Sequence, residues 1–140
     1  MASVNPSPDR FEKFLESVEN GAPLVMINLL KYRDRADYPA GFDAAPCTGR
    51  EAYQRYAAVA LGKVTQVGGK PLWMGSVTGS LIAPDGEEWD EALLVQYPSR
   101  QAFLQMVAMP DYQAVAVHRT AALADSRLIA TVTRGGPLAE

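Results

Sequence analysis

The sequence predicts an α+β fold in which one antiparallel sheet carries helices on a single face. A nearly continuous apolar run at 24–33, rich in branched residues, is typical of a strand covered on both faces. A helical pattern at 48–67 follows, then two strand patterns, a second helical stretch and a last strand. This βαββαβ order is that of the ferredoxin-like layer, and right-handed crossovers give the spatial strand order 4-1-3-2.

An extra helix precedes this core. Ser7 is a suitable N-cap, Pro8 suits the first helical turn and Gly21 closes the segment, so we expect a helix over 8–20. The ferredoxin-like core should span 24–133, followed by a frayed tail at 134–140. The whole chain, 1–140, is therefore read as a single domain.

The segment 34–47 has two prolines, one glycine and no hydrophobic period. It is long for a connection in a compact domain, so it is a candidate lid over a site. The alternative is a surface loop pinned by Tyr38 and Phe42. Thr48 and Glu51 then form a capping-box signature for the helix that runs to Gly68 and Gly69.

The second half predicts a hairpin, a broken helix and a last strand. In the hairpin, Trp73, Val77 and Leu81 alternate with Met74, serines and a threonine, which predicts a strand with one more apolar face. The glycines and serines of this segment suggest that the strand lies at an edge of the sheet. The remaining elements are a Pro-Asp-Gly turn at 84–86, a strand at 89–97, a helix from Ser99 to Asp125 interrupted at Pro110, and a strand at 127–133.

Composition and charge limit the classes of partner that the protein can bind. A chain of 140 residues with 48% hydrophobic and 21% charged residues matches one soluble domain. A net charge of -3 without a basic cluster argues against nucleic acid and anionic membranes, and no apolar run reaches the roughly 18 residues that a membrane span needs. The N-terminal residues show no secretion or transit pattern, so we expect a cytoplasmic protein.

Metal and cofactor motifs are not found in the sequence. One cysteine, Cys47, and one histidine exclude an internal disulfide and a structural zinc site within one chain. No Gly-rich phosphate loop, Ser-His-Asp order or cofactor lysine motif stands out. The sequence therefore predicts neither a metal site nor a cofactor.

The central strands predict self-association. Val25, Ile27 and Leu29 alternate with Met26 and Leu30, so both faces of the first strand are apolar. Helices can cover only one of these faces. A second copy of the same sheet would cover the other, which gives an isologous homodimer with a barrel-like interior.

Four motifs, "GGKPLWMGS", "LVQYPSRQAF", "MPDYQAVAVHRTAAL" and "SRLIAT", resemble the domain of unknown function 1330 family of the dimeric α/β-barrel superfamily. The resemblance covers about residues 68–132. "VMINLLKYR" is similar to the first strand of a longer-chained branch, whereas the leading helix and the 34–47 segment exceed the compact family pattern. The resemblance implies a ferredoxin-like dimer, and Tyr112 and Arg119 match an aromatic and an arginine of its helical motif.

Arg119 interrupts the apolar face of a predicted helix, so its charge needs an anion or several acceptors. A structural partner would be Asp90, Asp125 or carbonyls at a strand end. A functional partner would be the carboxylate or enolate of a small ligand, held bidentately. A dimer contact is the third alternative.

Other polar and aromatic residues complete the candidate site. His118 is either a general base or a surface residue, and Asn28 is either a ligand orienter or the donor of a structural hydrogen bond. The candidate catalytic residues are His118 and Arg119. The candidate ligand-binding residues are Asn28, Tyr53, Trp73, Trp89, Tyr112 and Arg119, although aromatic residues at these spacings are commonly core residues.

Two classes of function stay open. Related barrel families include cofactor-independent oxygenases and isomerases, so the first class is an enzyme of this kind acting on a small organic anion; the resemblance itself implies no particular activity. Arg119 would then stabilise an oxyanion, His118 or a tyrosine would move a proton, and Asn28 would orient the substrate. In the alternative, the protein is a non-catalytic accessory or metabolite-sensing dimer in which Arg119 and Asn28 are structural.

Overall fold

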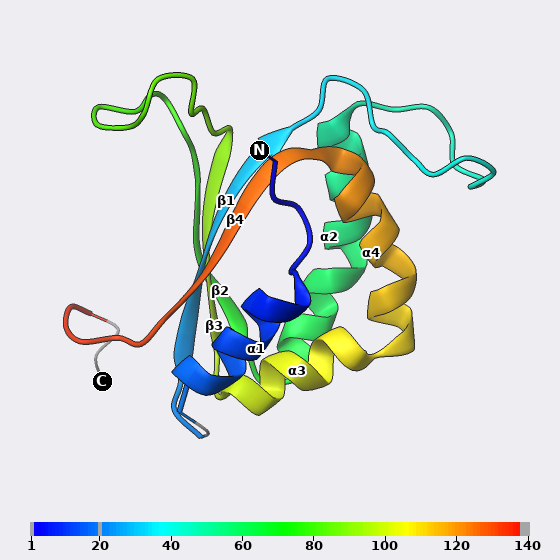
Figure 1. The fold of residues 1–140 in the computed structure, drawn as a ribbon. Coiled ribbons are helices and arrows are strands. Elements are labelled where there is room, and N and C mark those ends of the chain that lie inside the picture. The colour runs from blue at the N-terminus through cyan, green and yellow to red at the C-terminus, as the bar shows by residue number, and fades with distance from the viewer. Residues whose placement is uncertain (1, 20, 138–140) are drawn as a thin grey trace.

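The computed structural model describes residues 2–19 and 21–137, and its helices and strands follow the predicted order. They are α1 (Pro8–Ser17), β1 (Leu24–Tyr32), α2 (Gly49–Gln66), β2 (Lys70–Ser76), β3 (Glu91–Tyr97), α3 (Arg100–Ala108), α4 (Pro110–Ala122) and β4 (Leu123–Thr131). The strands pair antiparallel in the order β2-β3-β1-β4, which confirms the predicted α+β, ferredoxin-like topology. Figure 1 shows the helices on one side of this sheet.

Strand β1 lies at the centre of the sheet, between β3 and β4, because its apolar side chains suit coverage on both faces. Asn28 pairs with Leu93 and Leu128 on the face that carries the helices. Ile27 pairs with Leu94 and Ile129, so these side chains lie on the opposite face, which we call the open face.

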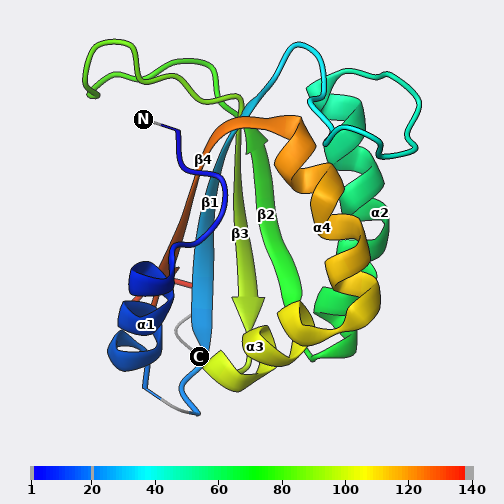
Figure 2. The same cartoon turned by 45° about the vertical axis from the view of Figure 1, so that its right-hand side comes forward.

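Two groups of buried side chains fill the space between the sheet and the helices. One lies toward α1 and α3 and contains Leu24, Val95 and Met106, with Phe14 of α1 packed edge-on against Phe103 at 5.6 Å. The other lies toward the start of α2 and the end of α4 and contains Leu30, Ala52 and Leu123. Figure 2 shows α1 beside the β4 side of the sheet, away from α2.

Helix α2 begins as predicted. The Thr48 hydroxyl accepts from the Glu51 N–H at 3.1 Å, and the Glu51 carboxylate accepts from the Thr48 N–H at 2.9 Å. This reciprocal capping box satisfies two donors that the helix itself leaves free. Hydrogen bonding to Thr48, first through its backbone N–H and then through its side chain, also lowers the pKa of Glu51.

Two predicted helix ends are wrong. Helix α1 ends at Ser17, not at residue 20, because Val18 turns extended and buries its side chain at 5% exposure. Helix α4 ends at Ala122 and β4 starts at once, because Ala122 and Leu123 are both fully buried and the chain must turn directly into the sheet. Residue 20 and the last part of the predicted tail, 138–140, lie outside the described residues.

Strand β2 is an edge strand, as expected, but it stops at Ser76 instead of continuing through Leu81. Residues 77–90 form an irregular excursion that we call the β2–β3 arm. The arm leaves the sheet on the side opposite the helices (Figure 1). The predicted turn is present, with Gly86 at a φ of 82° and a 3.2 Å hydrogen bond from the Glu87 N–H to the Pro84 carbonyl.

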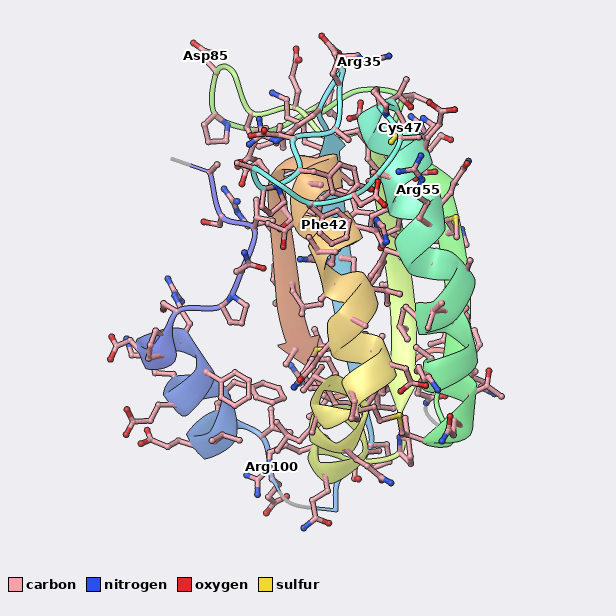
Figure 3. All side chains as sticks on the ribbon, turned by 90° about the vertical axis from the view of Figure 1, so that its right-hand side faces the viewer. Arg35, Phe42, Cys47, Arg55, Asp85 and Arg100 are labelled. Carbon is pink, nitrogen blue, oxygen red and sulfur yellow. The ribbon has the colours of Figure 1, made fainter. Side chains whose placement is uncertain are left out.

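The 34–47 segment packs on the outer surface of α2 and α4, as the pinned-loop alternative predicts. Tyr38 and Phe42 stack with ring centroids 5.3 Å apart. Arg55 of α2 donates to the Tyr38 hydroxyl at 3.2 Å and to the Ala45 carbonyl at 3.3 Å. Figure 3 shows Phe42 of the segment and Arg55 of α2 on this face of the molecule. Cys47 is buried at the end of the segment, and its carbonyl accepts from the Ala36 N–H at 2.9 Å.

Within residues 2–19 and 21–137, the helices are too short or too polar to cross a lipid bilayer.

Candidate functional site

A cavity of about 110 Å³ lies between the sheet and the helices α2, α3 and α4. Most of its wall is apolar, and the main contributors are Met26, Val64, Leu93, Val95 and Met106. Three lining side chains are exposed to solvent at 42–55%: Leu61 on α2, Met74 on β2 and Leu128 on β4. Because β2 and β4 are opposite edges of the sheet, the cavity meets solvent at both edges.

Polar side chains reach this cavity from four elements: Asn28 from β1, Tyr53 and Tyr56 from α2, Tyr97 from β3, and Tyr112 and Arg119 from α4. The spacing explains why they converge. Tyr53 and Tyr56 are three residues apart and share one face of α2. Tyr112 and Arg119 are seven residues apart, about two turns, and share one face of α4.

The tyrosines form a connected row across the two helices. The hydroxyls of Tyr56 and Tyr112 are 2.7 Å apart, and the rings of Tyr53 and Tyr56 lie 5.3 Å apart. Burial raises the pKa of Tyr53 to about 12, against the effect of the nearby Arg119 charge. Burial, followed by the contact with Tyr112, also raises the pKa of Tyr56 well above its usual value. These hydroxyls are therefore neutral donors and acceptors at physiological pH.

Arg119 has a backbone partner. Its Nη1 atom donates to the Val4 carbonyl oxygen at 2.7 Å, which ties α4 to the N-terminal segment 2–7. Neither carboxylate considered from the sequence is its partner. Asp90 accepts from the Tyr32 N–H at 2.8 Å, and Asp125 accepts from the Ser3 N–H at 2.8 Å and from Arg127 at 2.9 Å.

Asn28 lies on the helix-facing side of β1, on the same face as Met26. In the described part of the chain, its side chain has one hydrogen bond, a long contact of 3.5 Å from Nδ2 to the Met26 carbonyl. A contact of that length is at the limit of a hydrogen bond. Most of the hydrogen-bonding capacity of this amide is therefore directed into the cavity.

His118 lies outside the cavity, against the 34–47 segment. Its Nδ1 atom is 2.6 Å from the Tyr38 hydroxyl, and its ring packs edge-on against Tyr38 and Phe42 of the 34–47 segment. Burial, followed by the charge of Arg55, lowers its pKa. His118 does not line the cavity, so the structure separates it from Arg119 despite their adjacency in sequence.

The two tryptophans proposed as ligand-binding residues also lie outside the cavity. Trp73 pairs with Leu94 on the open face and is 54% exposed. Trp89 sits at the base of the β2–β3 arm, where the Arg127 guanidinium lies 5.0 Å from its ring centroid. On β2 the cavity-lining side chain is instead Met74, next to Trp73.

Tyr56, Tyr97 and Met106, which the sequence also suggests as possible pocket-lining residues, line the cavity. Tyr56 lies one helical turn after Tyr53 on the same apolar stripe. Metal ligands are not grouped: no cluster of three or more histidine, cysteine or carboxylate side chains occurs among the residues that the structure describes.

Residues 44–132 match the family described as Domain of unknown function (DUF1330), and the chain belongs to this family. The family assignment made from the sequence motifs is thus confirmed. No curated protein matches the chain.

A solved structure of the RPA0582 protein of unknown function from Rhodopseudomonas palustris is 34% identical, with a TM-score of 0.88 over 97% of this chain and 100% of that chain. A second structure, of methylated RPA0582 protein, is 35% identical, with a TM-score of 0.88 over 97% and 98% of the two chains. The likeness covers α1 and the 34–47 segment as well as the core.

A more distant likeness concerns the fold alone. SnoaB, a cofactor-independent oxygenase from Streptomyces nogalater, is 13% identical, with a TM-score of 0.53 over 85% of this chain and 99% of that chain. Hydroxynitrile lyase from Passiflora edulis is 12% identical, with a TM-score of 0.51 over 83% and 97% of the two chains. The same sheet and helix layer therefore supports more than one chemistry.

Proposed function

We propose that this protein is a homodimer that binds a small organic anion in the cavity between the sheet and α2 and α4. The observation that carries the proposal is Arg119, a permanent cation on the wall of an otherwise apolar, tyrosine-lined cavity. Among the described residues, its guanidinium has one hydrogen bond, to a neutral carbonyl, and no carboxylate within 4.0 Å. A guanidinium has five N–H donors, so most remain for a ligand.

The size of the cavity limits the ligand. A dry cavity of about 150 Å³ lined by aliphatic and aromatic side chains accommodates benzene. The cavity of about 110 Å³ therefore suits a ligand of about that size or smaller, with modest side-chain movement. A monocyclic or short branched carboxylate meets this limit, whereas a nucleotide or an acyl chain with its carrier does not.

The polar groups suit a carboxylate or an enolate. Arginine binds such oxygens through two parallel hydrogen bonds. Tyr53 stays protonated because burial raises its pKa, so its hydroxyl supplies a further neutral donor. Asn28 on the opposite wall would set the orientation of the ligand.

The homodimer is supported by the open face. Ile27, Leu29 and Leu94 are only half-buried there, and Trp73 and Ile129 are 54% and 48% exposed. Contiguous apolar surface of this kind marks an interaction site. A second copy supplies a complementary apolar sheet by symmetry.

Catalysis is a second candidate, favoured by the same convergence of donors. Arg119 and the Tyr53 hydroxyl would stabilise a developing oxyanion, as in a cofactor-independent oxygenase or isomerase reaction. Binding is the better-supported function because the one histidine, a candidate proton carrier, contacts Tyr38 rather than the cavity. An accessory or metabolite-sensing role would require only that the protein binds the anion, without catalysis.

The test is a thermal-melt titration of the purified protein with benzoate and with its neutral isostere benzamide. We expect benzoate to raise the Tm of the wild type and benzamide to have little effect. Arg119→Leu should abolish the benzoate response, whereas Arg134→Leu, at an exposed position in the tail, should preserve it. If a panel of small aromatic and aliphatic carboxylates leaves the wild-type Tm unchanged, the ligand proposal is rejected.

A further inference from the structure

The tip of the β2–β3 arm is the most exposed apolar feature of the described chain. Leu81 is 99% and Ile82 is 93% exposed, so two neighbouring aliphatic side chains have almost no contact with their own chain. Scattered single apolar residues on a surface need no explanation. Two adjacent ones at the end of a projecting segment indicate a partner.

The base of the arm is attached to the sheet. The Val77 N–H donates to the Asp90 carbonyl at 2.9 Å, and the Asp90 N–H donates to the Leu30 carbonyl at 2.8 Å. Arg127 of β4 stacks on Trp89 at 5.0 Å and contacts the Glu87 carboxylate at 3.9 Å. These contacts join the arm to both β1 and β4.

Figure 1 shows the arm projecting on the side of the sheet that carries no helices. The apolar open face, with Trp73 and Ile129, lies on that same side. A partner that covers the open face would therefore also meet the arm. We propose that the arm of each copy packs Leu81 and Ile82 against the second copy and thereby completes the dimer interface; this rests on the homodimer proposed above.

The area of the sheet favours an added contact. Four strands about 4.8 Å apart, of seven or nine residues each at about 3.3 Å per residue, have a flat outline of roughly 500 Å². A stable protein interface buries about 800 Å² of accessible surface on each partner. An arm of residues 77–90 adds contact area at the rim of the sheet.

Charge argues against a lipid surface as the alternative partner. The arm carries four carboxylates, at Asp85, Glu87, Glu88 and Asp90, and no lysine or arginine. Cytoplasmic leaflets are negatively charged and attract basic segments. The acidic arm would be repelled, so a second protein chain is the better occupant.

The test compares dimer dissociation constants by sedimentation for three proteins. Leu81→Ser with Ile82→Ser should raise the dimer Kd by at least about 100-fold, because each dimer loses four aliphatic side chains from its interface. These positions are nearly fully exposed within one chain, so the folded structure should be unaffected. Ile129→Asp, on the open face, should raise the Kd further.

The outcomes separate the two proposals. A wild type that is monomeric at micromolar concentration rejects the homodimer itself. A wild-type dimer that Ile129→Asp dissociates, while the double serine variant keeps its Kd, rejects the arm contact alone.

A second readout is photocrosslinking. Replacing Ile82 with p-benzoylphenylalanine should give a covalent two-chain product, whereas the same replacement at exposed Gln54 of α2 should not. Absence of that product at position 82, or binding of the wild type but not the double serine variant to phosphatidylcholine–phosphatidylglycerol vesicles, overturns the arm contact.

Discussion

The Nη1 atom of Arg119 donates a 2.7 Å hydrogen bond to the carbonyl oxygen of Val4, a residue 115 positions away in sequence. The bond links a cavity-lining cation to the N-terminal segment 2–7. Other contacts hold the same segment: the Ser3 N–H donates to Asp125 at 2.8 Å, and the Ser126 hydroxyl donates to the Ser3 carbonyl at 2.6 Å. The segment thus closes the edge of the fold where α4 turns into β4.

The first prediction follows from the type of this partner. Arg119→Leu removes a hydrogen bond to a neutral carbonyl rather than one side of a buried ion pair. We therefore expect a loss of about 1–2 kcal/mol in unfolding free energy, below the roughly 3–5 kcal/mol of a broken buried ion pair. Urea denaturation measures this loss, and faster amide exchange at Val4 and Asn5 should accompany it. A loss of about 4 kcal/mol or more would indicate an ionic partner and a structural role.

The second prediction concerns pH. Burial lowers the pKa of His118 below its ordinary value of about 6.5, so the unfolded or detached state binds a proton more readily. The stability that His118 contributes is complete above about pH 6.5 and is lost as the pH falls through the lower, folded-state pKa. Attachment of the 34–47 segment should therefore weaken as the pH falls from about 6.5 toward about 5.

Limited proteolysis measures this attachment. Cleavage within 34–47 should speed up at about pH 5, after correction for protease activity. His118→Phe keeps a ring against Tyr38 and Phe42 but cannot titrate, and His118 is the only histidine, so the variant should lose the pH dependence. An equal pH dependence in both proteins would assign it to carboxylates elsewhere.

The topology could be predicted from the sequence because each element carries its own local signal. The capping box of Thr48 and Glu51 fixes the start of α2, and the doubly apolar pattern of 24–33 fixes β1 at the centre. Sheet order then follows from handedness and short connections.

The candidate site was only partly predictable. Alternation along β2 separates Trp73 from Met74, but it does not say which of them faces the helices, and a bulge between Pro71 and Trp73 shifts the register. The Arg119–Val4 bond joins segments 115 residues apart, and no local pattern encodes it. The contact between Tyr38 and His118 is likewise tertiary.

The third prediction concerns the tyrosine pair in the cavity. Tyr56→Phe leaves the Tyr112 hydroxyl without its partner at 2.7 Å, so we expect a loss of about 1–2 kcal/mol. Tyr112→Phe should cost a similar amount. The double variant removes both hydroxyls together and should cost clearly less than the sum, which gives a coupling energy by denaturant melts. Additive losses would show that the two hydroxyls have other partners.

The fourth prediction compares two glycines of α2. A Cβ at Gly49 would lie 2.6 Å from the Ala122 carbonyl oxygen and closer still to the Arg33 carbonyl oxygen, and both are backbone atoms that hold the end of α4 and the chain after β1. The Gly49 N–H also donates to Arg33 at 3.1 Å, so the helix cannot move away without losing that bond. Gly49→Ala should therefore lower the unfolding free energy by about 3 kcal/mol or more.

Gly62 lies in the same helix and serves as the matched control. A Cβ added there would have no neighbouring atom within 4 Å, so Gly62→Ala should stabilise the protein by about 0.5–1 kcal/mol through helix propensity. Thermal and urea melts of both variants measure these changes in stability. If Gly49→Ala were as stable as the wild type, the close approach of α2, β1 and α4 would be wrong.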